Sequence, residues 1–131
     1  MSKDWIKDIQ EFHTEVMLDP FTPKDKPHIP TSKYEELRFN LIDEEVKETL
    51  EAIETQDLVK LAEGIADSIV VLLGTALTYG IDLQPIWDEV HHTNMAKKGG
   101  LMRPDGKRLK PEGWQPPNIQ RLIKEQQSAR V

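Results

Sequence analysis

The sequence of 131 residues contains no cysteine. This absence excludes disulfide bonds, catalysis by a thiolate and zinc sites built on cysteine. A reducing compartment, the cytoplasm, is therefore the default expectation for the location of the chain. The beginning of the chain carries an acid, Asp4, and no apolar segment of the kind that makes a secretory signal.

Long hydrophobic runs are also missing. The longest apolar run is residues 69–73, with Asp67 just ahead of it, whereas a membrane-spanning helix needs roughly 18 apolar residues. We therefore expect no membrane partner. The net charge of −6 is the wrong sign for a chain that coats nucleic acid, so we expect no nucleic-acid partner either.

Strand-like alternation of apolar and polar residues is absent, and helical periodicity is present instead. Residues 3–18 repeat apolar side chains at spacings of three and four, which predicts an amphipathic helix. Asp19 and Pro20 end this helix, and a loop rich in proline follows it. The length suits one domain over residues 1–131. The hydrophobic share of 37% is modest for a monomer and favours a core completed by another copy.

Start and stop signals delimit three further helices, over residues 32–54, residues 57–79, and residues 82 to the glycine pair 99–100. Ser32 and Glu35 have the spacing of a capping box. Asp57 and Asp82 are suited to cap the next two helices, and Gly80 to end one of them in a left-handed conformation. The chain is therefore predicted to be an all-α bundle of four to five helices.

The chain after residue 100 reads as a basic loop. Residues 103–107 form a turn signal, so we expect a loop or a short hairpin over residues 103–117 and a short terminal helix over residues 118–128. The basic residues from 97 to 110, opposed only by Asp105, are Lys97, Lys98, Arg103, Lys107, Arg108 and Lys110.

Acidic residues on the helix over 32–54 lie at the edge of its packing face. At about 100° per residue, Glu45 and Glu48 project within about 60° of each other. They share that side with apolar positions such as Leu41 and Ala52, whereas Glu44 lies nearer the outside. A run of charge on a helix is usually a solvated face, so these acids alone do not define a site.

The helix over residues 57–79 adds the decisive acid. Asp67 is the only charged residue between Ile65 and Leu77, in a stretch that is apolar or small all round. A buried carboxylate without a partner costs several kcal/mol unless it is protonated, paired or bound to a metal. Glu63 lies one turn before Asp67. We therefore expect acidic side chains of the helices over residues 32–54 and 57–79 to lie in the same region of the bundle.

Oxygen ligands without cysteine suit hard cations such as Mg²⁺ or Mn²⁺. The alternative is that Arg38 or Lys60 forms a salt bridge into the same acids. The acids outnumber these bases, which favours a metal site. A cationic loop near such a site is suited to polyphosphate, although a solvated basic tail explains the lysines equally well.

Polar residues of the fourth predicted helix offer further candidates. Asn94 and Lys97 share a side with His91, and Asn94 could orient a sugar or a phosphate. Glu89 and His92 have the Glu-x-x-His spacing of di-iron bundles, but such sites need the motif on two helices and it occurs here once. An iron protein is therefore the weaker interpretation.

The order of these motifs resembles the all-α nucleoside triphosphate pyrophosphohydrolases. These are the MazG-like proteins, related to dimeric dUTPases and to phosphoribosyl-ATP pyrophosphohydrolase, and the resemblance points to their small bacterial and phage branch. It covers roughly residues 5–125. The segments that carry it are Glu44-Glu45-Val46-Lys47-Glu48, Ala66-Asp67, Gly74-Thr75-Ala76, Tyr79-Gly80-Ile81, Glu89-Val90-His91, Asn94-Met95-Ala96-Lys97, Asp105-Gly106-Lys107 and the stretch from Leu109 to Trp114.

The resemblance implies a helical bundle that forms a homodimer or a dimer of dimers. It implies two to three Mg²⁺ or Mn²⁺ ions held by Glu45, Glu48 and Asp67, and attack of water on the α-phosphorus of a nucleoside triphosphate. Glu45 or Glu48 would accept the proton of that water. The second acidic motif departs from the family because its glutamate position is Gly64, so Glu63 or Glu44 would supply the missing ligand.

The resemblance also places Asn94 and Lys97 at the nucleotide, and we add His91, Lys107 and Lys110 as candidate substrate-binding residues. The leading substrates are dUTP or a purine nucleotide such as dGTP. Ile9, Phe12 and His13 are candidates for base contacts, although core packing is the simpler role for the first two. The competing hypothesis is a nucleotide-binding bundle that has lost catalysis at Gly64.

Overall fold

The computed structural model describes residues 3–129, and this part of the chain is helical without a β-strand. The elements are α1 (Trp5–Phe12), the π-helical turn η1 (His13–Met17), α2 (Ser32–Glu54), α3 (Leu58–Thr78), α4 (Leu83–Met95) and α5 (Ile119–Ala129). The all-α fold predicted from the sequence is confirmed. The predicted hairpin in the basic segment is reduced to a turn closed by one antiparallel bridge between Met102 and Arg108.

Most helix ends follow the sequence signals. The Asp57 side chain accepts a hydrogen bond from the Lys60 amide at 3.0 Å and caps α3. Asp82 caps α4 in the same way, and Gly80 follows α3 with a φ of +69°. A Cβ on Gly80 would collide with the Lys26 carbonyl, so only glycine fits there.

The capping-box prediction at the start of α2 is wrong. The N-cap is Thr31, Ser32 is already the first helical residue, and no side chain caps this end. The Thr31 carbonyl accepts hydrogen bonds from the Tyr34 and Glu35 amides instead. Ser32 lies one residue too far along the chain for its hydroxyl to act as the N-cap of a capping box.

The helix predicted over residues 3–18 forms, but it ends in η1 rather than in regular α-helix. Its N-cap is Asp4, whose side chain accepts from the Lys7 amide at 3.0 Å. Leu18 then takes a left-handed φ of 53°, and its amide donates to the His13 carbonyl. This wide last turn closes the helix before Asp19.

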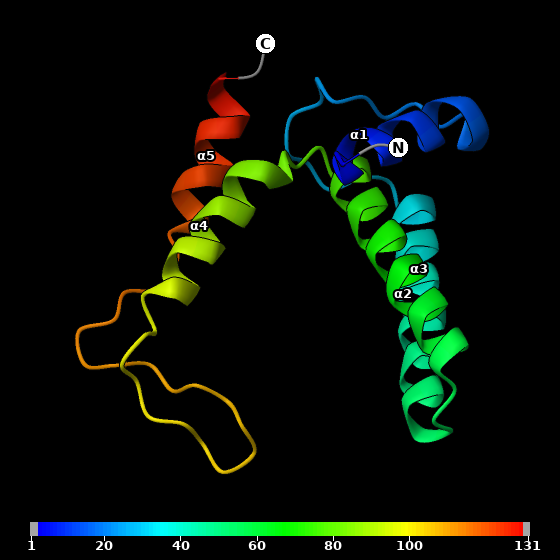
Figure 1. The fold of residues 1–131 in the computed structure, drawn as a ribbon. Helices are drawn as coiled ribbons and strands as arrows, with labels where there is room; N and C mark the ends of the chain where they lie inside the picture. Colours follow the sequence, from blue (N-terminus) through cyan, green and yellow to red (C-terminus); the bar gives the residue numbers. More distant parts are fainter. Residues whose placement is uncertain (1–2, 130–131) are drawn as a thin grey trace.

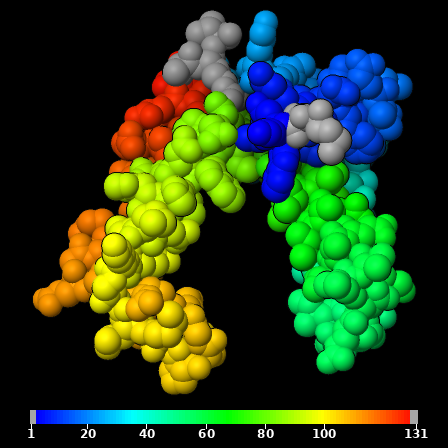
Figure 2. Space-filling model, viewed as in Figure 1, coloured from blue at the N-terminus to red at the C-terminus, as the bar shows by residue number. Residues whose placement is uncertain are grey.

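The helices are arranged as an arch (Figure 1). Helices α2 and α3 lie antiparallel, side by side, and form one arm; α1 packs against α3 near the top of this arm. Helices α4 and α5 pack together and form the other arm, with the loop of residues 96–118 at its lower end. The space-filling view shows open space between the two arms (Figure 2).

The apolar core of a single chain is small. Its fully buried hydrophobic residues include Ile9, Ala52, Val71 and Leu77. Helix α3 is long and apolar enough to cross a membrane by length and composition, a property that core helices share, yet only 28% of its apolar window is buried. Much of the most apolar helix therefore lies uncovered within one chain.

Candidate functional site

Helices α2 and α3 approach each other closely at Gly64. A Cβ at this position would lie 2.6 Å from Thr49 Oγ1. Thr49 Oγ1 donates to the Glu45 carbonyl at 2.8 Å and lies 3.1 Å from Ser68 Oγ on α3. These contacts bring the helical turn that carries Glu45 directly beside the turn of α3 that carries Asp67.

Glu45 is the centre of an acidic cluster. Its Oε2 atom is buried and has no hydrogen-bond partner. Burial raises the pKa of Glu45 above its ordinary value, and the negative charges of Glu48, Asp67 and Glu44 raise it further. The structure thus brings together four of the predicted metal ligands, from two helices, around a carboxylate oxygen that lacks a donor.

No base neutralises this cluster within residues 3–129. None of the ion pairs there includes Glu44, Glu45, Glu48 or Asp67. Arg38 is buried elsewhere in α2, where its Nη2 donates to the Val71 carbonyl at 2.7 Å and its Nε donates to Thr75 Oγ1 at 3.0 Å. The salt bridge weighed as an alternative from the sequence is not formed by Arg38.

The charges of Glu44, Glu48 and Asp67 act on Glu45, but the four carboxylates are not arranged as the ligands of one metal ion. In the described part of the chain, no three His, Asp or Glu side chains lie together in a geometry that would hold a metal ion. Glu63 is exposed, and Gly64 is buried against Thr49. The unpaired oxygen of Glu45 is therefore the feature that fits a cation, because a cation would supply the missing partner.

A second buried polar cluster joins η1 to α2 and α3. His13 is 2% exposed, and its Nδ1 lies 2.5 Å from Asp19 Oδ2. A Cβ on Gly74 would meet both Arg38 Nη2 and His13 Nε2 at 2.6 Å. Burial lowers the pKa of Arg38, and the charge of Asp19 opposes this effect. This cluster fixes the first helix in place and gives His13 a structural role.

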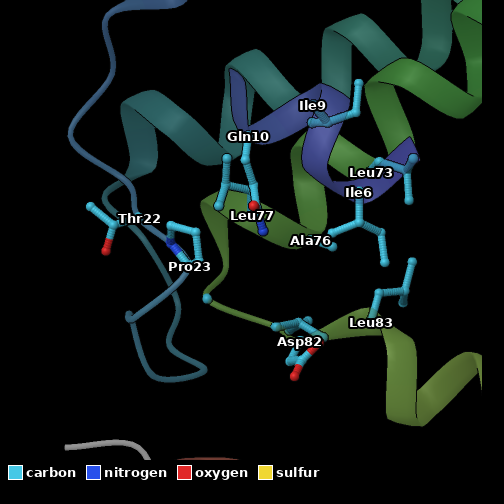
Figure 3. A pocket seen from close by; sticks show the side chains of 12 residues that line it. Ile6, Ile9, Gln10, Thr22, Pro23, Leu73, Ala76, Leu77, Asp82 and Leu83 are labelled. Atoms are coloured by element: carbon cyan, nitrogen blue, oxygen red, sulfur yellow. The ribbon is translucent and has the colours of Figure 1, made fainter. Parts of the chain in front are cut away.

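The two remaining candidates of the first helix differ in burial, because Ile9 is in the core and Phe12 is 37% exposed. Ile9 is 6% exposed, and it lines a cavity of about 160 Å³ beneath α1 with Leu73 and Leu77 of α3 (Figure 3). Ligand pockets have volumes of about 300–1,000 Å³, so this cavity is too small for a nucleotide. The core-packing role expected for Ile9 is confirmed, and Phe12 lies edge-on to the His13 ring at 5.8 Å.

The predicted substrate-binding residues lie on the other arm. His91 and Asn94 are exposed on α4, and Lys107 is exposed in the loop that follows. No hydrogen bond or ion pair joins residues 96–118 to α2 or α3 in the described part of the chain. The structure thus places these residues and the acidic cluster on separate arms of the arch (Figure 1).

Trp114 organises two of the lysines. Its Nε1 donates to the Thr93 carbonyl at the end of α4 at 2.7 Å. Lys97 Nζ lies 5.4 Å and Lys110 Nζ 4.8 Å from the centre of the Trp114 ring. Both distances are in the cation–π range. Trp114 was not predicted as a functional residue, although an aromatic residue close to the basic segment is a usable signal in the sequence.

The Glu-x-x-His motif is not part of a second site. Glu89 Oε2 lies 3.5 Å from Arg121 Nη2 of α5, and His92 is exposed. The ion pair of Glu89 with Arg121 links α4 to α5 at the surface. Glu89 and His92 lie on the arm opposite the acidic cluster, which removes the basis for a di-iron centre.

Fold and site together define an all-α protein with a carboxylate cluster between two antiparallel helices. The family model of phosphoribosyl-ATP pyrophosphohydrolase matches residues 10–94, well over half of the chain. The chain belongs to this family of nucleotide pyrophosphohydrolases, which is related to the MazG-like enzymes. No curated protein sequence matches the chain significantly. The matched region includes the acidic cluster and ends before Lys97, so the loop of residues 96–118 lies outside it.

Proposed function

We propose that the chain is a metal-dependent (deoxy)nucleoside triphosphate pyrophosphohydrolase. It would hydrolyse the bond between the α- and β-phosphates and release a nucleoside monophosphate and pyrophosphate. Membership of a pyrophosphohydrolase family supports the class of reaction. The observation that carries the proposal is the buried, unpaired Oε2 of Glu45 among Glu48, Asp67 and Glu44.

Carboxylates in this arrangement need a positive partner at neutral pH. Glu45, Glu48 and Asp67 would hold two or three Mg²⁺ or Mn²⁺ ions, with Glu44 or Glu63 as the further ligand. Bound there, such ions would polarise the phosphoryl group and lower the pKa of a bound water.

The same carboxylates have a second task during hydrolysis. Glu45 or Glu48 would accept the proton of the attacking water, because either can reach the volume between the helices. Asn94, Lys97 and His91, with Lys107 and Lys110 of the loop, would bind the sugar and the outer phosphates.

The preferred base is the open part of the proposal, with dUTP and dGTP as the leading candidates and phosphoribosyl-ATP named by the family. A homodimer or a dimer of dimers would complete the bundle, because only 28% of the apolar window of α3 is buried in one chain. A cytoplasmic location accords with the absence of cysteine.

A second candidate is a nucleotide-binding bundle without turnover. The observation that favours it is Gly64, which stands where the family's second motif has a glutamate. The close contact with Thr49 leaves no room there for any side chain. If neither Glu44 nor Glu63 replaces that ligand, nucleotide would bind and remain intact.

The test is pyrophosphate release from ribo- and deoxynucleoside triphosphates and phosphoribosyl-ATP, with Mg²⁺, with Mn²⁺ and with EDTA. Wild type is compared with Asp67→Asn and with Glu51→Gln, a matched control on the exposed side of α2. We expect metal-dependent release that Glu51→Gln retains and that Asp67→Asn reduces by at least about 100-fold. Nucleotide binding without release from any substrate would support the second candidate instead.

A further inference from the structure

The loop that follows α4 is closed on itself by backbone contacts. The Leu109 amide donates to the Leu101 carbonyl at 2.7 Å. Gly100 is buried, and a Cβ at this position would collide with the Leu109 carbonyl. Arg108 Nη1 donates to the Gly100 carbonyl at 2.6 Å. The chain therefore turns back to the residues that follow α4, and Lys110 comes directly after this return.

Trp114 is anchored to the same end of α4. Its Nε1 donates to the Thr93 carbonyl at 2.7 Å, and Thr93 is 6% exposed. The Trp114 amide donates to the Pro111 carbonyl at 3.1 Å, which closes a turn just before the ring. The tryptophan is only half-buried. Its ring is thus held by the fold while part of it stays open to solvent.

Two lysines from separate segments lie over this ring. Lys97 Nζ is 5.4 Å and Lys110 Nζ 4.8 Å from the Trp114 ring centre, and a cation within about 6 Å is attracted to an aromatic ring. Within residues 3–129, the other such contact joins sequence neighbours, Lys33 and Tyr34, at 5.8 Å. Trp114 therefore brings together two charges that the sequence keeps apart.

The two ammonium groups have no acidic partner in the described part of the chain. None of the ion pairs there includes Lys97 or Lys110. Asp105, the one acid between residues 97 and 110, pairs with Arg103 instead. Like charges held near one ring repel each other, and the ring does not neutralise them. A bound anion would relieve this repulsion.

We propose that Trp114 is a positioning residue whose ring holds Lys97 and Lys110 together as one site for two adjacent phosphate groups. Each lysine offers a compact charge with three donors, so each can pair with one phosphate of a diphosphate. The inference rests on the proposed function for the source of this ligand, the pyrophosphate half of a nucleoside triphosphate. The three residues lie beyond residues 10–94, which match the family.

The ring acts by ordering the lysines before the anion binds. A long side chain loses rotamer freedom when it is fixed on a ligand, and side chains that are already ordered lose less. Trp114→Leu removes the ring, and we expect it to weaken anion binding by about 5-fold or more. Trp114→Phe keeps a weaker aromatic face without the Nε1 donor. It should therefore bind more tightly than Trp114→Leu and less tightly than wild type.

Titration with pyrophosphate in EDTA tests the site without metal and without turnover. In protein labelled with ¹³C-lysine, the ring should shift the ε-methylene signals of Lys97 and Lys110 upfield, and both should respond to pyrophosphate. Trp114→Leu should abolish the shift and weaken binding as stated. Lys98→Ala, at the exposed lysine next to Lys97, is the matched control and should bind like wild type.

Three results of this titration would overturn the inference. The first is the absence of the upfield shift in wild type, which needs no variant. The second is wild-type protein that does not bind pyrophosphate. The third is equal affinity in wild type and in folded Trp114→Leu. If Trp114→Leu does not fold, equal affinities in wild type and Trp114→Phe would have the same meaning.

Kinetics with a nucleoside triphosphate separates this inference from the proposed function. In an active enzyme, Trp114→Leu should raise KM by the same factor and change kcat little, because the lysines bind the outer phosphates alike in the ground state and the transition state. An unchanged KM would overturn the inference and leave the proposed function intact. Wild-type protein that binds pyrophosphate on the ring-held lysines but hydrolyses no nucleotide would retain the inference and reject the proposed function.

Discussion

Gly64 and Thr49 set the distance between α2 and α3, because a Cβ on Gly64 would lie 2.6 Å from Thr49 Oγ1 and 3.2 Å from Thr49 Cα. The same contact orients the turn that carries Glu45, through the hydrogen bond from Thr49 to the Glu45 carbonyl. The glycine that replaces the glutamate of the second acidic motif is thus the same residue that allows the close contact between the helices.

We expect Gly64→Ala to destabilise the protein. An added methyl group in a tight contact costs about 1–3 kcal/mol, which exceeds the gain of roughly 0.5–1 kcal/mol in helix propensity. Thr49→Ala removes the nearest atom, so the double variant should lose less stability than the sum of the two single variants. Urea unfolding of all four proteins measures this coupling. Strict additivity would contradict the close contact.

Metal-free protein should become less stable as the pH rises above the ordinary glutamate pKa of 4.5. The folded-state pKa of Glu45 is raised, so between the two values the folded state binds more protons than the unfolded state, and stability falls with rising pH. Glu45→Gln removes this charge. In EDTA at pH 7 it should raise Tm by roughly 3–5 °C for each kcal/mol relieved.

Thermal unfolding of Glu45→Gln at pH 7 and pH 5 checks the sign of this effect. The advantage over wild type should shrink at the lower pH, where the wild-type carboxyl is increasingly protonated. Glu51→Gln, at an exposed glutamate of the same helix, is the control variant. If Glu45→Gln is less stable than wild type at pH 7 in EDTA, the unpaired charge of Glu45 does not destabilise the folded protein.

Glu44 rather than Glu63 should complete the metal site. The charge of Glu44 acts directly on Glu45, whereas Glu63 is not among the charges that raise the pKa of Glu45. Mn²⁺ titration followed by electron paramagnetic resonance should show affinity weakened at least about 10-fold in Glu44→Gln, and little change in Glu63→Gln. The reverse order would assign the ligand to Glu63.

Leu50→Arg should separate the two copies. Leu50 is a large apolar residue of α2 that is 54% exposed in one chain. If the proposed homodimer covers it, an arginine there would leave a charge buried between the copies. Leu58→Arg is the matched control, because Leu58 is 78% exposed at the beginning of α3, at the far end of the hairpin. Sedimentation should give a monomer for the first variant only. A dimer that tolerates Leu50→Arg would place the contact elsewhere.

The helices could be predicted because their signals are local. Asp57 and Asp82 cap the helices that they precede, and Gly80 ends α3. The error at Ser32 is a shift of one residue, and a capping pattern alone does not decide between Thr31 and Ser32. The π-helical ending of the first helix coincides with the contacts of His13 with Asp19 and with Gly74 of α3, and no capping pattern in the sequence signals it.

The acidic cluster was predictable because its residues lie on two consecutive helices that must pack. Glu45 and Glu48 project to the same side of their helix, and Asp67 is the isolated charge of the next one. These two observations were enough to predict that the three carboxylates lie near one another. The separation of the lysines from these acids was not predictable. It depends on the direction in which α4 leaves Gly80, and no periodicity in the sequence encodes that direction.

The two arms also divide the chain into parts that can vary separately. The acidic cluster lies on α2 and α3, and the lysine-bearing loop follows α4. Substitutions in the loop of residues 96–118 can therefore alter what the loop binds while the packing around Gly64 stays the same.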